Sequence, residues 1–180
     1  MKLLFALIIV GQAGCGYRVM PTEKLYGHST IILKTFNEES PLGLSAELSA
    51  SLHQKFLNGN LNISHSSELN FPVLEGIIND ITTRPSSLAG AGSSIPAYQV
   101  RLKVSVLLRE SSGTVLWKKT FRYSEDYLSP RSNTDNSVLK TEANRRRALK
   151  RMAEKIADEI RKELFLNATL AKGPEENTRQ

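Results

Sequence analysis

Residues 98–123 read YQVRLKVSVLLRESSGTVLWKKTFRY and carry the clearest structural pattern in the chain. Apolar side chains occupy every second position from Tyr98 to Leu108, and polar or charged ones such as Arg101, Lys103 and Ser105 stand between them. This alternation is typical of a strand with one buried and one solvated face. The segment Glu110-Ser111-Ser112-Gly113 supplies a turn, so the stretch predicts a β-hairpin. On the return strand, one face carries Val115, Trp117, Phe121 and Tyr123, and the other carries Lys118, Thr120 and Arg122.

The residues before the hairpin predict a strand, a helix and two more strands. Residues 30–36 are rich in β-branched side chains and predict a strand. Leucine or phenylalanine recurs every fourth residue from Leu44 to Phe56, which predicts an amphipathic helix ending at about residue 57. Its predicted N-cap is Ser40, with Pro41 at the first helical position and Asn58-Gly59-Asn60 as the stop. Residues 61–63 and 73–81 predict strands, and the Ser/Gly/Ala-rich residues 84–94 a loop.

A second, longer helix is predicted after a loop at residues 124–136. Its apolar residues follow the i, i+3, i+4, i+7 rule from Leu149 to Leu164. The order of elements predicts an α+β fold: a two-layer sandwich with two helices packed on one face of a mostly antiparallel four- to five-stranded sheet. The other face of that sheet would carry Arg101, Lys103 and Lys118, which are candidate basic residues for binding a partner.

The N-terminal residues have the layout of a secretory signal peptide. Lys2 supplies a positive start and Leu3–Val10 a short apolar run, too short to span a bilayer. Cys15, the only cysteine, follows directly and resembles the modified cysteine of a bacterial lipobox, although Gln12 stands where a branched apolar residue is usual. The resemblance implies an N-acyl and S-diacylglycerol lipid on Cys15, with no other cofactor. The alternative is an ordinary signal peptide followed by a free thiol, which is unusual in an oxidising compartment.

These features divide the chain into a signal peptide (1–14), a lipidated tether (15–27), one α+β domain (28–166) and a disordered tail (167–180). Gly16 follows the cysteine where inner-membrane lipoproteins carry aspartate, so resemblance to bacterial lipoproteins implies an outer-membrane anchor facing the periplasm. The net charge of +6 suits an anionic partner. Export argues against nucleic acid as that partner.

The residues that catalysis or metal binding would need are missing. His28, His53 and His65 have no companions at metal-ligand spacing, so no metal site is expected. The sequence has no nucleophile elbow and no glycine-rich phosphate loop between a strand and a helix. A binding or assembly protein is therefore expected, and not an enzyme.

The chain resembles the LptE family of lipopolysaccharide-assembly lipoproteins. The resemblance rests on Cys15-Gly16-Tyr17-Arg18, on a strand ending Leu33-Lys34-Thr35-Phe36-Asn37, on the hairpin from Tyr98 through Trp117, and on the helix segment Asn144-Arg145-Arg146-Arg147-Ala148-Leu149. It implies a non-catalytic protein that plugs the LptD β-barrel, helps it to assemble and contacts lipopolysaccharide. Within this resemblance, Arg131 and then Arg84 are the candidate lipopolysaccharide-binding residues, because guanidinium groups bind phosphate in a bidentate manner.

A separate basic cluster on the second helix includes Arg146 and Lys150. It is either a solvated helix face or a site that docks to acidic residues of a barrel or to lipid headgroups. Two other classes of protein remain open for the whole chain. One is a periplasm-facing lipoprotein that activates a peptidoglycan synthase or acts in a secretion channel. The other is a structural envelope lipoprotein without a dedicated partner.

Overall fold

Three long strands form the centre of the fold: β4 (Val73–Pro85), β5 (Ala97–Arg109) and β6 (Val115–Leu128). They pair antiparallel in sequence order, and a tight turn with Gly113 at φ 94° joins β5 to β6. The short strands β1 (Thr30–Leu33), β2 (Asn37–Glu38) and β3 (Asn62–Ser64) complete a six-stranded sheet, with parallel pairing on the other side of β4. This computed structural model describes residues 23–38, 43–64, 70–86, 96–130 and 135–171.

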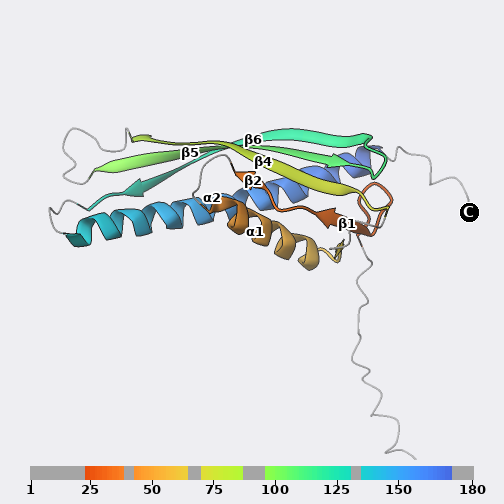
Figure 1. Cartoon of the computed structure of the whole chain (residues 1–180), viewed down its shortest axis with the longest axis horizontal. Helices are drawn as coiled ribbons and strands as arrows, with labels where there is room; N and C mark the ends of the chain where they lie inside the picture. Colours follow the sequence, from red (N-terminus) through yellow and green to blue (C-terminus); the bar gives the residue numbers. More distant parts are fainter. Residues whose placement is uncertain (1–22, 39–42, 65–69, 87–95, 131–134, 172–180) are drawn as a thin grey trace, which may run out of the picture.

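Two helices, α1 (Leu44–Asn58) and α2 (Asp135–Ala171), lie side by side on one face of this sheet (Figure 1). In the part of the chain that the structure describes, no element covers the opposite face. The α+β two-layer prediction is therefore confirmed. The sheet is mixed because antiparallel pairing holds for the long strands, whereas the short strands add parallel pairs.

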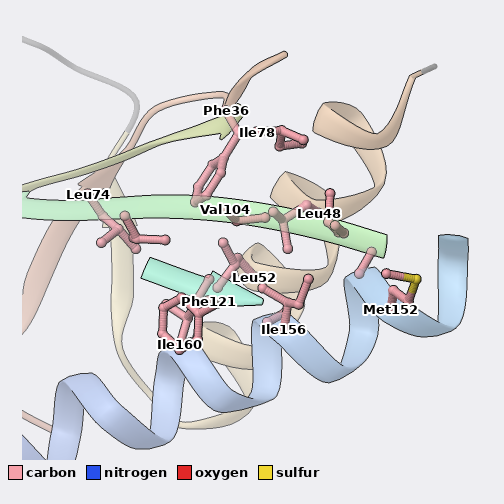
Figure 2. Packing of buried hydrophobic residues seen from close by; sticks show 14 of the residues in the cluster. Phe36, Leu48, Leu52, Leu74, Ile78, Val104, Phe121, Met152, Ile156 and Ile160 are labelled. Carbon is pink, nitrogen blue, oxygen red and sulfur yellow. The ribbon is translucent and has the colours of Figure 1, made fainter. Parts of the chain in front are cut away.

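The core lies between the helices and the inner face of the sheet (Figure 2). Leu48 and Leu52 of α1 and Met152, Ile156 and Ile160 of α2 are fully buried. They meet Val104 and Phe121 from the long strands, together with Leu74 and Ile78. Burying each such side chain contributes on the order of 1.5–3 kcal/mol, so this layer holds the domain together without a disulfide.

Phe36 closes the core where the chain passes from β1 to β2. Its ring lies over Gly76 of β4, where an added Cβ would stand 2.2 Å from the Phe36 Cε1 atom. The Phe36 backbone N–H donates to the Ser49 hydroxyl of α1 over 3.2 Å. The absence of a side chain at residue 76 therefore makes room for the ring that joins the short strands to the core.

Polar contacts attach the edge strand β6 to α2. Lys119 pairs with Glu163 over 2.8 Å, and Tyr123 donates a hydrogen bond to Glu159. Glu125 accepts from Arg151 and Lys155, each over 2.8 Å. The four helix residues recur every four positions and so form one stripe along α2.

Several boundaries differ from the sequence-based predictions. Helix α1 begins at Leu44 with Gly43 as N-cap, while the predicted cap at Ser40 and Pro41 lies outside the described residues. Strand β4 continues through Arg84 and Pro85, which were predicted to start a loop. Its pairing with β5 overrides the local loop composition, and proline is tolerated at a strand end.

The later elements are also longer than predicted. Strand β6 extends to Leu128, into the predicted 124–136 loop, because each added residue up to Leu128 pairs with β5. Helix α2 continues to Ala171, beyond the predicted domain end at 166, because Ala168 is still buried. Val115, predicted to lie on the apolar face, is exposed, since the register shifts between Leu108 and Arg109 at the hairpin end.

Candidate functional site: the uncovered face of the sheet

The face of the sheet turned away from the helices carries four of the candidate residues; we call it the open face. Along β5, alternate residues from Val100 to Leu108 are almost fully buried against the core. The residues between them, including Arg101 and Lys103, must therefore point to the open face. The cross-strand register identifies their neighbours on β4 and β6.

Three successive rows cross the middle of the open face. Lys103 lies between Asp80 of β4 and Arg122 of β6. The next row is Ile77, Ser105 and Thr120, and the one after it is Glu75, Leu107 and Lys118. Arg101, Lys103 and Lys118 thus share one face, as the alternation predicts, and the structure adds Arg122 to them.

Arg84 joins the same face through a β-bulge in β4. The register between β4 and β5 shifts between Ile78 and Asp80, so Asn79 is the extra residue. A bulge of this kind reverses the alternation beyond it. As a result Arg84 is paired with Gln99, on the side of the sheet that also carries Arg101. The sequence treated Arg84 and Arg101 as separate candidates; the structure places them on one surface.

Two cations of the open face share one carboxylate. Glu75 pairs with Arg109 over 2.9 Å and with Lys34 over 3.4 Å. The hydrogen bond from Arg109, opposed in part by burial and helped by Lys34, holds the pKa of Glu75 below its usual value. The carboxylate is therefore ionised and offsets one of the two positive charges, which leaves the cluster with a net charge of +1.

The other cations of the open face are not balanced in this way. Among the described residues, no ion pair involves Arg84, Arg101, Lys103, Lys118 or Arg122. Arg101 donates only to the neutral side chain of Gln99, over 2.8 Å. Basic residues therefore outnumber acidic ones on this face, with Glu75, Asp80 and Asp126 as its carboxylates.

A shallow groove of about 700 Å³ crosses the open face where β1 and β2 meet β4. Lys34 and Lys118 stand at its sides. On its floor Ser105 donates to the Asn79 side chain over 2.8 Å and lies 3.3 Å from the Thr120 hydroxyl. The groove offers cations and small polar groups, and these suit the binding of a polar or anionic ligand more than catalysis. Only tertiary pairing reveals the role of Asn79, since a bulge has no clear signal in this sequence.

Arg146 and Lys150 lie on α2, in the helical layer, and so do not belong to the open face. Arg146 is exposed and pairs with Glu142 over 3.1 Å, four residues earlier on the helix. Lys150 lines a separate groove between α1 and α2, together with Glu47 and Glu154. The two residues are thus available on the surface but form a different site.

The remaining candidates fall outside what the structure describes. Cys15 and Arg131 belong to the segments 1–22 and 131–134, which are not described. In the described part of the chain, no cluster of His, Cys, Asp and Glu could hold a metal ion. No helix of that part is long and apolar enough to cross a membrane.

Comparison with known proteins identifies a family. The model of the LptE lipopolysaccharide-assembly family matches residues 29–164, which is well over half of the chain. No curated protein sequence matches significantly.

Among solved structures, the rare lipoprotein B of Shewanella oneidensis is 16% identical, with a TM-score of 0.54 over 78% of this chain and 98% of that one. The minor lipoprotein of Acinetobacter baumannii is 14% identical, with a TM-score of 0.48 over 73% of this chain and 90% of that one. Lipoprotein B of Nitrosomonas europaea is 13% identical, with a TM-score of 0.48 over 89% of this chain and 99% of that one. At this identity the Shewanella structure supports the fold alone.

Proposed function

Since the chain belongs to the LptE lipopolysaccharide-assembly family, we propose that it binds an LptD-like outer-membrane β-barrel, plugs its lumen, and assists barrel assembly and lipopolysaccharide transport. The observation that carries this proposal is the family match over residues 29–164, which spans both helices almost completely and the whole sheet. The work is binding, without a catalytic step.

The surface chemistry supports the plug role. The lumen of a large outer-membrane barrel is polar, and its lining residues alternate with lipid-facing ones. The domain offers a polar, basic open face on one side, and α2 contributes Arg146 and Lys150 on the other. A domain with polar groups on both of these surfaces can lie in a polar lumen.

The location that fits this role is the periplasmic side of the outer membrane, with Cys15 as the lipid attachment point. Intact-mass analysis of the membrane-extracted protein tests the anchor. The expected mass is that of a chain starting at Cys15 with diacylglycerol and one further acyl chain. An unmodified mass would show that the protein has no lipid anchor and is a soluble periplasmic protein.

Contact with lipopolysaccharide is the second part of the proposal, with Arg131 and Arg84 as phosphate ligands. Arg84 lies on the open face near Arg101, so two guanidinium groups are available there. Arg131→Glu and Arg84→Glu should each weaken binding of lipopolysaccharide to the full-length protein in detergent. The matched control is Lys140→Glu, which makes the same charge change at an exposed residue of α2. Unchanged binding in either variant removes that residue from the site.

The main test is affinity capture of the tagged full-length protein from detergent-solubilised membranes, followed by mass spectrometry. A large outer-membrane β-barrel recovered in near-equal amount is the expected result. A peptidoglycan synthase or a secretion channel in its place would assign the protein to that other class of periplasm-facing lipoproteins.

A further inference from the structure

The centre of the open face places two like charges directly opposite each other. Lys103 of β5 and Arg122 of β6 are cross-strand partners, and neither forms an ion pair among the described residues. Like charges at opposed positions destabilise a sheet, because side chains there lie only about 5 Å apart at Cβ. On β4, Asp80 is the register partner of Lys103. Arg122 has no such acidic neighbour on its outer side, because β6 is the edge strand of the sheet.

The fold itself gains nothing from this pair. Ser105 and Thr120, the next row of the same two strands, are neutral and lie within hydrogen-bond distance. The inner face of β6 neutralises its charges by pairing Lys119 and Glu125 with α2. Charges on this strand are thus balanced where they face the helix and left unbalanced where they face outward. An anionic group from outside the chain would relieve the repulsion.

The groove beside the pair indicates which kind of anion. It is shallow, and its lining combines the small polar side chains of Asn79 and Ser105 with the apolar side chain of Leu107. The largest exposed apolar side chain in it is Ile77, which is 42% exposed. Acyl chains need a deeper apolar pocket. An extended polypeptide with acidic side chains needs only a flat polar surface with cations at strand spacing, which is what Lys118, Lys103 and Arg122 provide.

We propose that Lys103 and Arg122, supported by Arg101 and Lys118, form a docking surface for acidic side chains of a partner protein. This inference rests on the proposed function, under which the partner is the barrel and the acidic side chains line its inner wall. It specifies which side of the domain meets that wall: the open face of the sheet and not the helical layer.

The test compares three forms of the tagged full-length protein, each co-expressed with the LptD-like barrel. They are the wild type, Lys103→Glu/Arg122→Glu, and the control Lys24→Glu/Lys140→Glu. The control changes the formal charge equally at two exposed lysines away from the open face. We expect the open-face variant to recover about tenfold less barrel than the wild type, because charge reversal turns attraction into repulsion. The control variant should recover the barrel within about twofold of the wild type, because exposed charges outside the docking surface contribute little to binding.

Two further measurements separate docking from misfolding. The neutral variant Lys103→Gln/Arg122→Gln removes the repulsion, so it should keep the thermal midpoint of the wild type or exceed it while still recovering less barrel. In the wild-type complex, zero-length carbodiimide cross-linking should join Lys103 or Lys118 to aspartate or glutamate of the barrel.

The outcomes distinguish the inference from the function. If the wild type recovers the barrel and both open-face variants recover as much, the docking surface is wrong and the proposed function stands. If the open-face variants still recover the barrel but lose lipopolysaccharide binding, the open face binds the glycolipid. The docking inference then fails as well. If the wild type recovers no barrel, both the function and the inference fail.

Discussion

At the scale of single residues, the contact between Phe36 and Gly76 determines how the short strands meet the core. The ring occupies the space in which any side chain at residue 76 would lie. Phe36 is 2% exposed and is held from the other side by Ser49 of α1. Neither residue can therefore be enlarged without a movement of β2 or α1.

Gly76→Ala should lower the free energy of unfolding by about 1–3 kcal/mol, because the new Cβ overlaps the Phe36 ring. Urea denaturation measures this change. The double variant Phe36→Val/Gly76→Ala tests the cause, because valine at residue 36 leaves room for the new methyl group at residue 76. Its loss should be smaller than the sum of the two single losses. Strict additivity would show that the ring and the glycine do not compete for space.

Glu125 makes stability depend on pH at the edge strand. Burial alone would raise the pKa of Glu125. The hydrogen bonds from Lys155 and Arg151 outweigh this effect, so the pKa in the folded protein lies below its usual value. A folded pKa below the unfolded one stabilises the fold above the unfolded value, and this stabilisation is lost as pH falls through the folded pKa.

Glu125→Gln should therefore cost about 1 kcal/mol at neutral pH and progressively less as the pH falls below about 4.5. Urea denaturation of both proteins across this pH range measures the difference. The control is Glu110→Gln in the hairpin turn, where the carboxylate accepts from Ser112 and from no other residue of the described ranges. A Glu125→Gln cost that stays constant with pH would contradict the assignment.

At the scale of elements, α2 has two parts with different surroundings. From Ala148 onward it contributes buried residues to the core, down to Ala168. Between Ser137 and Arg147 no residue is buried, and Val138 and Leu139 are about 70% exposed. We call Ser137–Arg147 the helical arm. Its described contacts with β6 and the residues just beyond it include Ser129 to Thr141, at 2.8 Å, and Asn144 to the Leu128 carbonyl, at 2.6 Å.

Asn144→Ala should loosen the arm while leaving the body of the domain intact. The lost hydrogen bond contributes about 1 kcal/mol, so amide exchange in the helical arm should accelerate about fivefold. Exchange between Met152 and Leu164 should stay unchanged. Asn167→Ala is the matched control, because the hydrogen bonds that this amide makes among the described residues stay within its own helix, to Glu163. Faster exchange throughout α2 would show that the helix opens as one unit.

At the scale of the whole molecule, the domain is elongated (Figure 1), and the side chains of its two sides differ in chemistry. Helix α2, with 37 residues, is about 55 Å long at 1.5 Å per residue. This exceeds the thickness of a bilayer including its headgroups, about 40–45 Å. The helical side carries ion pairs that neutralise many of its charges, whereas most cations of the open face form no ion pair with any described residue. Length and polarity both support the role of a plug that extends through a barrel.

If the open face docks by charge, recovery of the barrel by the wild-type protein should fall as the salt concentration rises. The Debye length shrinks from about 10 Å at 0.1 M to about 3 Å at 1 M, so surface attraction is screened. Affinity capture at graded sodium chloride concentrations measures this. Lys103→Gln/Arg122→Gln should show a shallower dependence than the wild type. Equal slopes for the two proteins would place the electrostatic contact elsewhere.

Elements with a local residue pattern could be predicted from the sequence. Alternation from Tyr98 to Leu108 predicted the β5–β6 hairpin and the face that carries Arg101, Lys103 and Lys118. The four-residue leucine repeat predicted α1, and the 3.6-residue period predicted α2. These patterns are readable because backbone geometry alone decides which side chains share a face. Cys15 as a lipid site and Arg131 as a phosphate ligand stay predictions.

Features that depend on long-range strand pairing became visible in the folded domain and not in any local pattern. The bulge at Asn79 turns Asp80 and Arg84 to the open face, and the register then sets Lys103 between Asp80 and Arg122. The extension of β4 to Pro85 depends on partners in β5 that the local composition does not show. A bulge and a register are properties of two strands at once. The pattern of either strand alone therefore could not show that Arg84 and Arg101 share one surface.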